Sequence, residues 1–216
     1  MCDQSTGRRL ACLIVFPCPV VRVGVRAALG ATNDLVASAE AGTIAEALGM
    51  ASVARPDVVL LAAPLLPSHG DRAPRRVAEI WPGSTAIVLS TVDWDVYLAR
   101  AWTAGAAGFL LTQHPLLTLV AGIRRAAAGK PIFSAEQLRR LQVWEQTMGS
   151  CLNALSPREA MVFRLVLAGK QTREIAEVLA ISRHTAEKHL GAILSKFGVD
   201  SRADLLALAF HHHLEA

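Results

Sequence analysis

The sequence has few cysteines and no long apolar run that is free of charge or proline. Its 216 residues include four cysteines, Cys2, Cys12, Cys18 and Cys151. Their spacing matches neither a metal-ligand pattern nor a disulfide framework, so we interpret them as reduced structural thiols and expect no metal. The segment Met1-Cys2-Asp3-Gln4 does not resemble a signal peptide, and no apolar run reaches membrane-spanning length. A cytoplasmic protein without a membrane partner is predicted.

The chain as a whole also lacks a large net charge. The formal net charge is +4, from 22 Lys and Arg against 18 Asp and Glu. Residues 155–216 contribute eight basic and seven acidic side chains, a net charge of only +1. A nucleic-acid interaction must therefore depend on a local motif. The sequence shows no Gly-rich phosphate loop, nucleophile elbow or paired carboxylates, which argues against an enzyme and against a cofactor.

Residues 171–199 carry the motif with the clearest chemistry, because they predict two helices joined by a tight turn. The first helix, over 172–179, has an apolar face of Ile175, Ala176, Val178 and Leu179. Ser182 is a good N-cap for the second helix, and Gly198 is a good C-cap. The apolar stripe of that second helix consists of Ala186, Leu190, Ile193, Leu194 and Phe197. This arrangement is typical of a helix-turn-helix that inserts its second helix into the major groove of DNA.

The polar side of this helical pair provides the candidate DNA-binding residues. They are Thr172, Arg173, Ser182, Arg183, His184, Thr185, Glu187, Lys188 and His189. We expect Thr185 and His189 to contact phosphates. Lys188 is suited to guanine O6 and N7, and Glu187 to the amino group of cytosine. The alternative is an ordinary amphipathic helical hairpin with a solvated charged face.

Residues 155–209 closely resemble the four-helix DNA-binding domain of the NarL/LuxR family. The matching landmarks are LSPRE at 155–159, AG at 168–169, EIA at 174–176, IS at 181–182, Thr185, His189 and Leu194. The resemblance implies a dimer on inverted-repeat promoter sites in double-stranded DNA. In this family the last helix, here 200–210, can form the dimer contact, with Leu205, Leu208 and Ala209 as candidates. One departure is Glu187, where the family usually has lysine, so the family's base preference does not transfer.

The first two-thirds of the chain alternate short apolar runs with helical stretches. Strands are predicted at 10–16, 35–39, 57–62, 86–90 and 108–111, and helices at 20–29, 44–53, 72–80, 95–104 and 115–128. Continuous apolar runs such as 58–61 suit central parallel strands that are covered on both faces. Five such units predict an α/β, doubly wound, five-stranded parallel sheet, with functional groups at the carboxyl ends of the strands.

This region resembles a response-regulator receiver domain of the CheY-like fold. The anchors are LIV at 13–15, Pro19, Arg22, Gly24, RPDVVLL at 55–61 and AGAAGFLL at 104–111. The resemblance implies a phosphorylation pocket, whose usual positions are here Phe16, Pro17, Ala62, Ser90 and Thr112. Phe16 and Pro17 replace the acidic pair that holds Mg²⁺, Ala62 replaces the phosphorylated aspartate, and Thr112 replaces the lysine. A hard cation needs oxygen ligands and a phosphoryl acceptor needs a nucleophile, so we expect no aspartyl phosphorylation.

Other carboxylates do not replace the missing ones. Asp57 lies at the opposite end of its strand, and Asp93 and Asp95 are interpreted as helix-start residues. Three interpretations of the altered pocket stay open: a filled core in a dimerisation scaffold, a pocket for a small molecule, and control by a protein partner, including a related regulator in a heterodimer.

The sequence therefore predicts a receiver-like domain at 9–129, a partly helical linker at 130–153, a helix-turn-helix domain at 154–210 and a tail at 211–216. The leading hypothesis is a dimeric, sequence-specific transcription regulator that phosphorylation does not switch. The alternatives are an adaptor that titrates a related regulator by dimerisation, and a regulator that responds to a small molecule.

Overall fold

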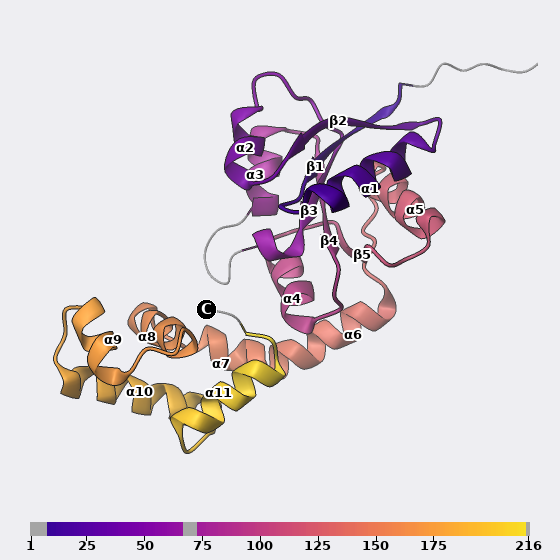
Figure 1. The fold of residues 1–216 in the computed structure, drawn as a ribbon. Coiled ribbons are helices and arrows are strands. Elements are labelled where there is room, and N and C mark those ends of the chain that lie inside the picture. The colour runs from indigo at the N-terminus through magenta and orange to yellow at the C-terminus, as the bar shows by residue number, and fades with distance from the viewer. Residues whose placement is uncertain (1–7, 67–72, 215–216) are drawn as a thin grey trace, which may run out of the picture. The chain divides into compact units, whose positions relative to one another are not determined.

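A computed structural model describes residues 8–66 and 73–214 of the chain (Figure 1). The chain divides into two compact units, one formed chiefly by residues up to Ala135 and the other chiefly by residues from Glu136 onward. Within the described ranges, every helix is too short or too polar to cross a membrane. Each unit is described by itself below.

The first unit is built on a five-stranded parallel sheet in the order β2-β1-β3-β4-β5. Its strands are β1 (Leu10–Val15), β2 (Leu35–Ala41), β3 (Val58–Ala62), β4 (Thr85–Ser90) and β5 (Gly108–Leu111). The central strand β3 is buried along its whole length, as its continuous apolar sequence predicts. This topology confirms the doubly wound parallel sheet.

Four helices and a short 3₁₀ turn lie between these strands in the sequence, and a fifth helix follows the last strand. They are α1 (Pro19–Gly30), α2 (Ile44–Gly49), η1 (Ala63–Leu65), α3 (Ala73–Ile80), α4 (Asp95–Thr103) and α5 (Leu116–Ala127). α1 and α5 cover one face of the sheet, and the other helices lie on the opposite face (Figure 1). The structure places five helices where five were predicted, although α2 ends at Gly49 rather than at residue 53.

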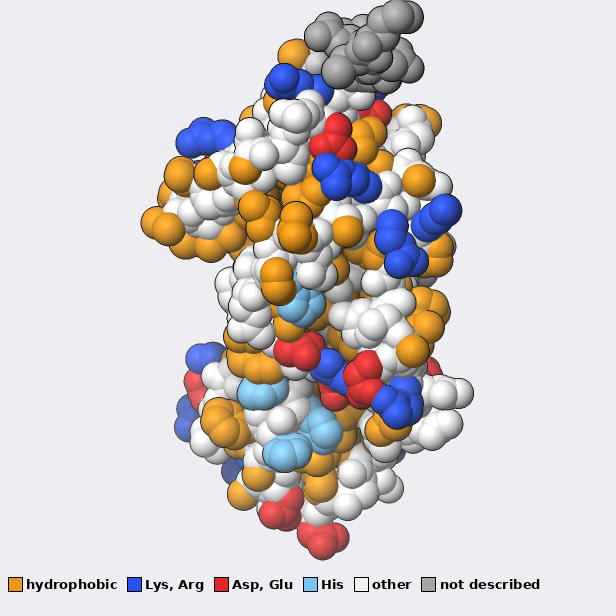
Figure 2. All heavy atoms as spheres, turned by 90° about the vertical axis from the view of Figure 1, so that its right-hand side faces the viewer, with side chains coloured by type: hydrophobic (Ala, Val, Ile, Leu, Met, Phe, Trp, Pro, Cys, Tyr) orange, Lys and Arg blue, Asp and Glu red, His pale blue; other side chains and the backbone are white. Residues whose placement is uncertain are grey.

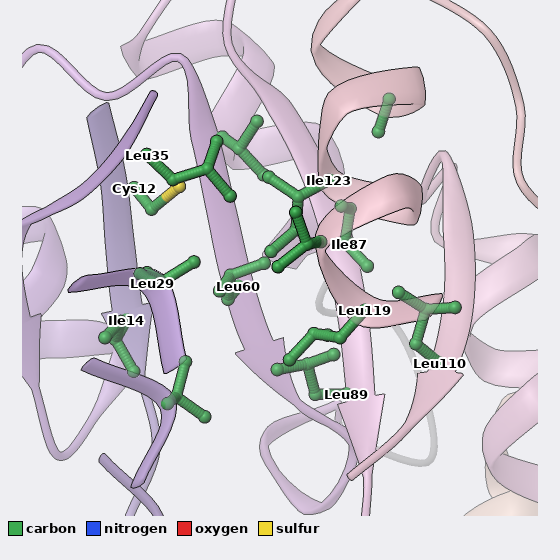
Figure 3. Packing of buried hydrophobic residues seen from close by; sticks show 14 of the residues in the cluster. Cys12, Ile14, Leu29, Leu35, Leu60, Ile87, Leu89, Leu110, Leu119 and Ile123 are labelled. Atoms are coloured by element: carbon green, nitrogen blue, oxygen red, sulfur yellow. The ribbon is translucent and has the colours of Figure 1, made fainter. Parts of the chain in front are cut away.

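The core beneath α1 and α5 is formed by alternate residues of the strands, because successive side chains of a strand point to opposite faces. Figure 3 shows Ile14, Leu60 and Leu89 directed into the same apolar layer as Leu29 of α1 and Leu119 of α5. The same cluster continues to Phe16 and Ala62 at the carboxyl edge of the sheet. The sheet edge that would hold a receiver's chemistry is therefore part of this hydrophobic core.

The second unit is helical throughout. Its helices are α6 (Ala135–Trp144), the π-helical segment η2 (Glu145–Gly149), α7 (Ser150–Asn153), α8 (Pro157–Leu167), α9 (Thr172–Val178), α10 (Arg183–Phe197) and α11 (Arg202–His211). The segment predicted as a linker is thus helical from Ala135 to Asn153. α8 to α11 pack around Val162, Phe163, Ile193 and Leu205, all nearly inaccessible to solvent. The predicted four-helix arrangement is confirmed.

Candidate nucleic-acid interface

The turn between α9 and α10 has the local structure that its sequence predicts. Ser182 caps α10, its hydroxyl accepting a hydrogen bond of 3.0 Å from the amide of Thr185. Ala180 adopts a left-handed conformation with φ of 52°, which lets the chain reverse within the turn. Gly198 ends α10 with φ of 63°, a backbone conformation that glycine adopts without strain. Both predicted caps of α10 are therefore confirmed.

Side chains from neighbouring helices fix the relative position of α9 and α10. The guanidinium of Arg158, at the start of α8, donates to the carbonyl of Leu179 at 2.6 Å. Arg202, at the start of α11, donates to the carbonyl of Lys170 at 2.7 Å. Each bond satisfies a carbonyl at or beyond a helix end that has no partner within its own helix. The helical pair is consequently held as a preformed unit.

A partly buried ion pair connects the start of α8 to the end of α10. Glu159 completes a capping box with Ser156, and its Oε2 accepts from the Lys196 ammonium at 2.6 Å. Lys196 also donates to the carbonyl of Ala154 at 2.9 Å. The Lys196 hydrogen bond, followed by those from Ser156, lowers the pKa of Glu159 from 4.5 to about 2. The Glu159 carboxylate is thus ionised at neutral pH.

The outward face of α10 presents the side chains expected to meet DNA. Arg183, His184, Glu187 and Lys188 are all exposed, on one side of the helix. Arg183 and Glu187 form an ion pair of 2.9 Å between Nε and Oε1, one turn apart. This pair was not predicted, although opposite charges four residues apart on a helix are its usual signal in a sequence. Among the exposed cations of this face, Lys188 is the base-reading candidate.

The other candidate residues lie around this face with different exposure. Thr185 and His189 are half-buried, and the Thr185 hydroxyl lies 2.8 Å from that of Ser182. On α9, Thr172 is half-buried, while Arg173 is exposed and pairs with Glu177 at 3.1 Å. The structure therefore brings all nine candidate residues to the two helices and the turn between them.

Gly191 lies on the same face as Lys188 and Glu187 and is exposed. A Cβ placed at this position would have no heavy atom within 4 Å, apart from its own helix. Glycine inside a helix costs about 0.5–1 kcal/mol relative to alanine. The fold of this chain gives no steric reason for that cost.

Two sequence expectations about apolar faces are wrong. Val178 was placed on the buried face of the first helix, but it is 60% exposed because α9 turns this residue away from α8 and α10. Leu205 and Ala209 were candidate dimer contacts, but both are buried in the core of the helical unit. The exposed apolar side of α11 consists instead of Ala203, Ala207 and Phe210, of which Phe210 is 83% exposed. Leu208 is half-buried.

At the carboxyl edge of the parallel sheet, two of the five residues in the receiver pocket positions are both buried and apolar. Phe16 and Ala62 are 4% and 0% exposed and belong to the core cluster, whereas Pro17 is exposed. The Ser90 hydroxyl, also buried, donates to the carbonyl of Val92 at 2.7 Å. Thr112 is half-buried, and its amide donates to the carbonyl of Ser90. Phe16 and Ala62 thus place buried apolar side chains at two of these five positions.

Charged groups near this edge are engaged in contacts of their own. The Arg22 guanidinium donates to the carbonyls of Phe16 and Pro17 at 2.6 and 3.2 Å and pairs with Glu40. Asp57 lies at the other end of the sheet, where its Oδ2 accepts from the amide of Ala11 at 2.8 Å. Asp95 begins α4, as predicted from the helix dipole. Within the described ranges, no three His, Cys, Asp or Glu side chains are grouped to hold a metal ion.

The cysteines that the structure describes are unpaired. Cys12 is buried in the core, Cys18 is exposed and Cys151 is half-buried. Burial, with a smaller contribution from Asp57, raises the pKa of the Cys12 thiol to about 12. These cysteines agree with the interpretation as reduced thiols, while Cys2 lies outside the described residues.

Comparisons with known proteins extend over both units. Residues 153–209 match the family described as "Bacterial regulatory proteins, luxR family". The transcriptional regulatory protein YxjL of Bacillus subtilis is 28% identical over 200 residues, which cover 90% of this chain and 92% of that protein. The response regulator VraR of Staphylococcus aureus is 25% identical over 195 residues, which cover 90% of this chain and 93% of VraR.

Two solved structures are similar along nearly the whole chain. RcsB from Salmonella enterica serovar Typhimurium, bound to promoter P1flhDC in the presence of the phosphomimetic BeF3⁻, has a TM-score of 0.60 and 21% identity. The match covers 93% of this chain and 97% of that one. The response regulator ChrA, from a heme-sensing two-component system, has a TM-score of 0.52 and 28% identity, over 95% of this chain and 98% of that one.

Proposed function

We propose that this chain, which is a DNA-binding transcription regulator of the response-regulator type, binds promoter DNA as a dimer and is not switched by aspartyl phosphorylation. One observation supports the independence from phosphorylation: Phe16 and Ala62 are buried in the hydrophobic core at the carboxyl edge of the sheet. We infer that the protein acts in the cytoplasm, where the DNA that it binds is located.

The chemistry of the strand ends supports independence from phosphorylation. Ala62 has no nucleophilic atom, and the side chains of Phe16 and Pro17 have no oxygen for Mg²⁺. The Ser90 hydroxyl already has a backbone partner. The same packing argues against a small-molecule pocket at this position, because Phe16 and Ala62 are buried in the hydrophobic core.

The surface of α10 supports sequence-specific DNA binding. Its exposed stripe runs from Arg183 and His184 to Lys188, next to a turn that neighbouring helices hold in place. A helix of this kind fits the major groove, where base edges present distinct hydrogen-bonding patterns. Two copies related by a two-fold axis would read an inverted repeat.

The outer side of the sheet unit supports a homodimer. On α1, Val20 and Val23 are 78% and 51% exposed, and Ala27 is exposed beside them. On α5, which covers the same face of the sheet, Leu117 is 81% exposed. Figure 2 shows the side of the molecule that lies at the right of Figure 1, where hydrophobic side chains reach the surface among scattered charges. Exposed apolar side chains on adjacent helices are typical of protein interfaces.

A second candidate function is an adaptor that pairs with a related regulator. The ion pair between Arg183 and Glu187 favours it, because Glu187 neutralises a cation on the face that would meet phosphates. The regulator is preferred because Lys188 and His184 stay exposed on that face.

One experiment separates these functions. The purified protein, with no phosphodonor, is used for footprinting on genomic DNA, and a second sample is incubated with acetyl phosphate and Mg²⁺ and weighed by intact mass spectrometry. We expect discrete palindromic sites in the untreated sample and no added mass in the treated one. A stoichiometric acid-labile phosphate would refute independence from phosphorylation, and an absence of protected sites would favour the adaptor.

A further inference from the structure

Gly191, like Gly24 and Gly49, is a glycine that the fold does not require, whereas it does require Gly122 and Gly198. At Gly122, in α5, an added Cβ would lie 2.8 Å from the Leu110 side chain, so the packing of the core excludes a larger residue. At Gly198 the positive φ of 63° disfavours a side chain. Gly191 has ordinary helical backbone, lies near the middle of α10 and meets nothing within 4 Å. Nothing in the described part of this chain excludes a side chain at position 191, so only another molecule could need glycine there.

The position of Gly191 on the helix indicates which molecule. It lies four residues after Glu187 and three after Lys188, and these spacings put all three on one face of α10. Lys188 and Glu187 are exposed there with long side chains, whereas Gly191 presents only its backbone beside them. All three lie on the face that the proposed function assigns to DNA.

We propose that the backbone of α10 approaches the base edges of the DNA most closely at Gly191. This inference rests on the proposed DNA-binding function. Because glycine has no side chain, its backbone is uncovered on the helix surface, and a base pair can contact that backbone directly. The close approach brings the Lys188 ammonium deeper into the major groove. A methyl group at position 191 would hold the helix away from the bases and weaken every base contact together.

The alternative is that Gly191 merely faces solvent. Then Gly191→Ala would improve the intrinsic helix propensity of α10 and leave DNA binding unchanged or tighter. The two possibilities predict opposite effects of one methyl group on affinity, while both predict a more stable helix. Affinity therefore distinguishes them, and the stability of the same variant shows that the substitution has not damaged the fold.

The experiment compares Gly191→Ala with Gly49→Ala in the full-length protein. Gly49 is a matched control, because it ends α2 of the other unit, is exposed and also has open space around an added Cβ. Fluorescence anisotropy measures binding to a duplex that carries a site protected by the wild-type protein, and to a duplex of scrambled sequence. Thermal unfolding is measured for each protein.

We expect Gly191→Ala to unfold at a higher temperature and to bind the specific duplex roughly tenfold more weakly, comparable to the loss of one base contact. Its binding to the scrambled duplex should change little, and Gly49→Ala should bind both duplexes like the wild type. Unchanged or tighter specific binding by Gly191→Ala would overturn this inference alone. Failure of the wild-type protein to prefer any site would overturn the proposed function instead.

Discussion

Removal of the charge on Glu159 tests how the DNA-binding unit is held together. Glu159 accepts hydrogen bonds from the Lys196 ammonium and from the amide of Ser156, and its side chain is only 9% exposed. Substitution by glutamine keeps the size and an acceptor oxygen but removes the charge. The variant therefore isolates the electrostatic part of the connection between α8 and α10.

The pKa of Glu159 gives the size and the pH dependence of this effect. A fall from 4.5 to about 2 corresponds to about 3 kcal/mol, at about 1.36 kcal/mol per pKa unit. Because the folded pKa is the lower one, the stabilisation is present above the unfolded pKa of 4.5 and is lost as the pH falls toward 2. Roughly two fifths of it should persist at pH 3. We expect Glu159→Gln to lower the free energy of unfolding by about 2–3 kcal/mol at pH 7.

The assay is calorimetric unfolding of the full-length protein at several pH values. Hydrogen–deuterium exchange of peptides from α8 and α10 assigns the transition to the helical unit. Glu174→Gln is the control, because Glu174 also forms a capping box and pairs with Lys170, but on the surface. Its effect should be clearly smaller, since solvent screens exposed pairs. Equal effects of the two substitutions, or a Glu159 effect independent of pH, would refute the reasoning.

Three further predictions concern the two units. Lys188→Ala should weaken specific binding by about 1–3 kcal/mol if Lys188 contacts a base; an unchanged affinity in anisotropy titrations would remove it from the interface. Val23→Glu should shift the protein toward monomer in sedimentation velocity, whereas Val53→Glu, at a valine that is 85% exposed on the segment after α2, should not; a dimer that tolerates the first change contradicts the assigned face. Phe16→Ala should lower the free energy of unfolding by about 3–5 kcal/mol in urea titrations; a small loss would mean that the ring is not part of the core.

Much of the fold could be predicted because the local signals are strong and agree. The apolar run at Val58–Leu61 predicts a central strand that is covered on both faces, and the structure buries it completely. Ser182 and Gly198 mark the ends of α10 within one residue, because a cap is a local hydrogen-bonding requirement. The signal for the end of α2 is weak. The apolar pattern continues to Val53, but the helix ends at Gly49.

The errors in the candidate site have a different physical origin. A helical period shows that Leu205 and Ala209 share a face, but it does not show whether that face meets the chain's own core or a second copy. In the structure, the face with Leu205 and Ala209 packs against α8 and α10, so only the opposite side of α11 is exposed to solvent. The same limit applies to Val178, because a short helix such as α9 has too few turns to define the width of its buried stripe. Tertiary packing therefore determined what the sequence pattern left open.

The two departures from the receiver and DNA-binding patterns differ in how easily they could be reversed. Ala62 is completely buried in the hydrophobic cluster that also contains Phe16, so an aspartate placed there would be desolvated and its pKa raised. If the protein is not phosphorylated, as proposed, restoring phosphorylation would require substitutions at several positions together, among them Phe16, Pro17 and Ala62. Glu187 is exposed, and its ion pair is with Arg183 on the same helix. One substitution at this surface position therefore changes the outward face of α10 without disturbing the fold. Under the proposed function, a change of DNA preference therefore needs fewer substitutions than a return to phosphorylation.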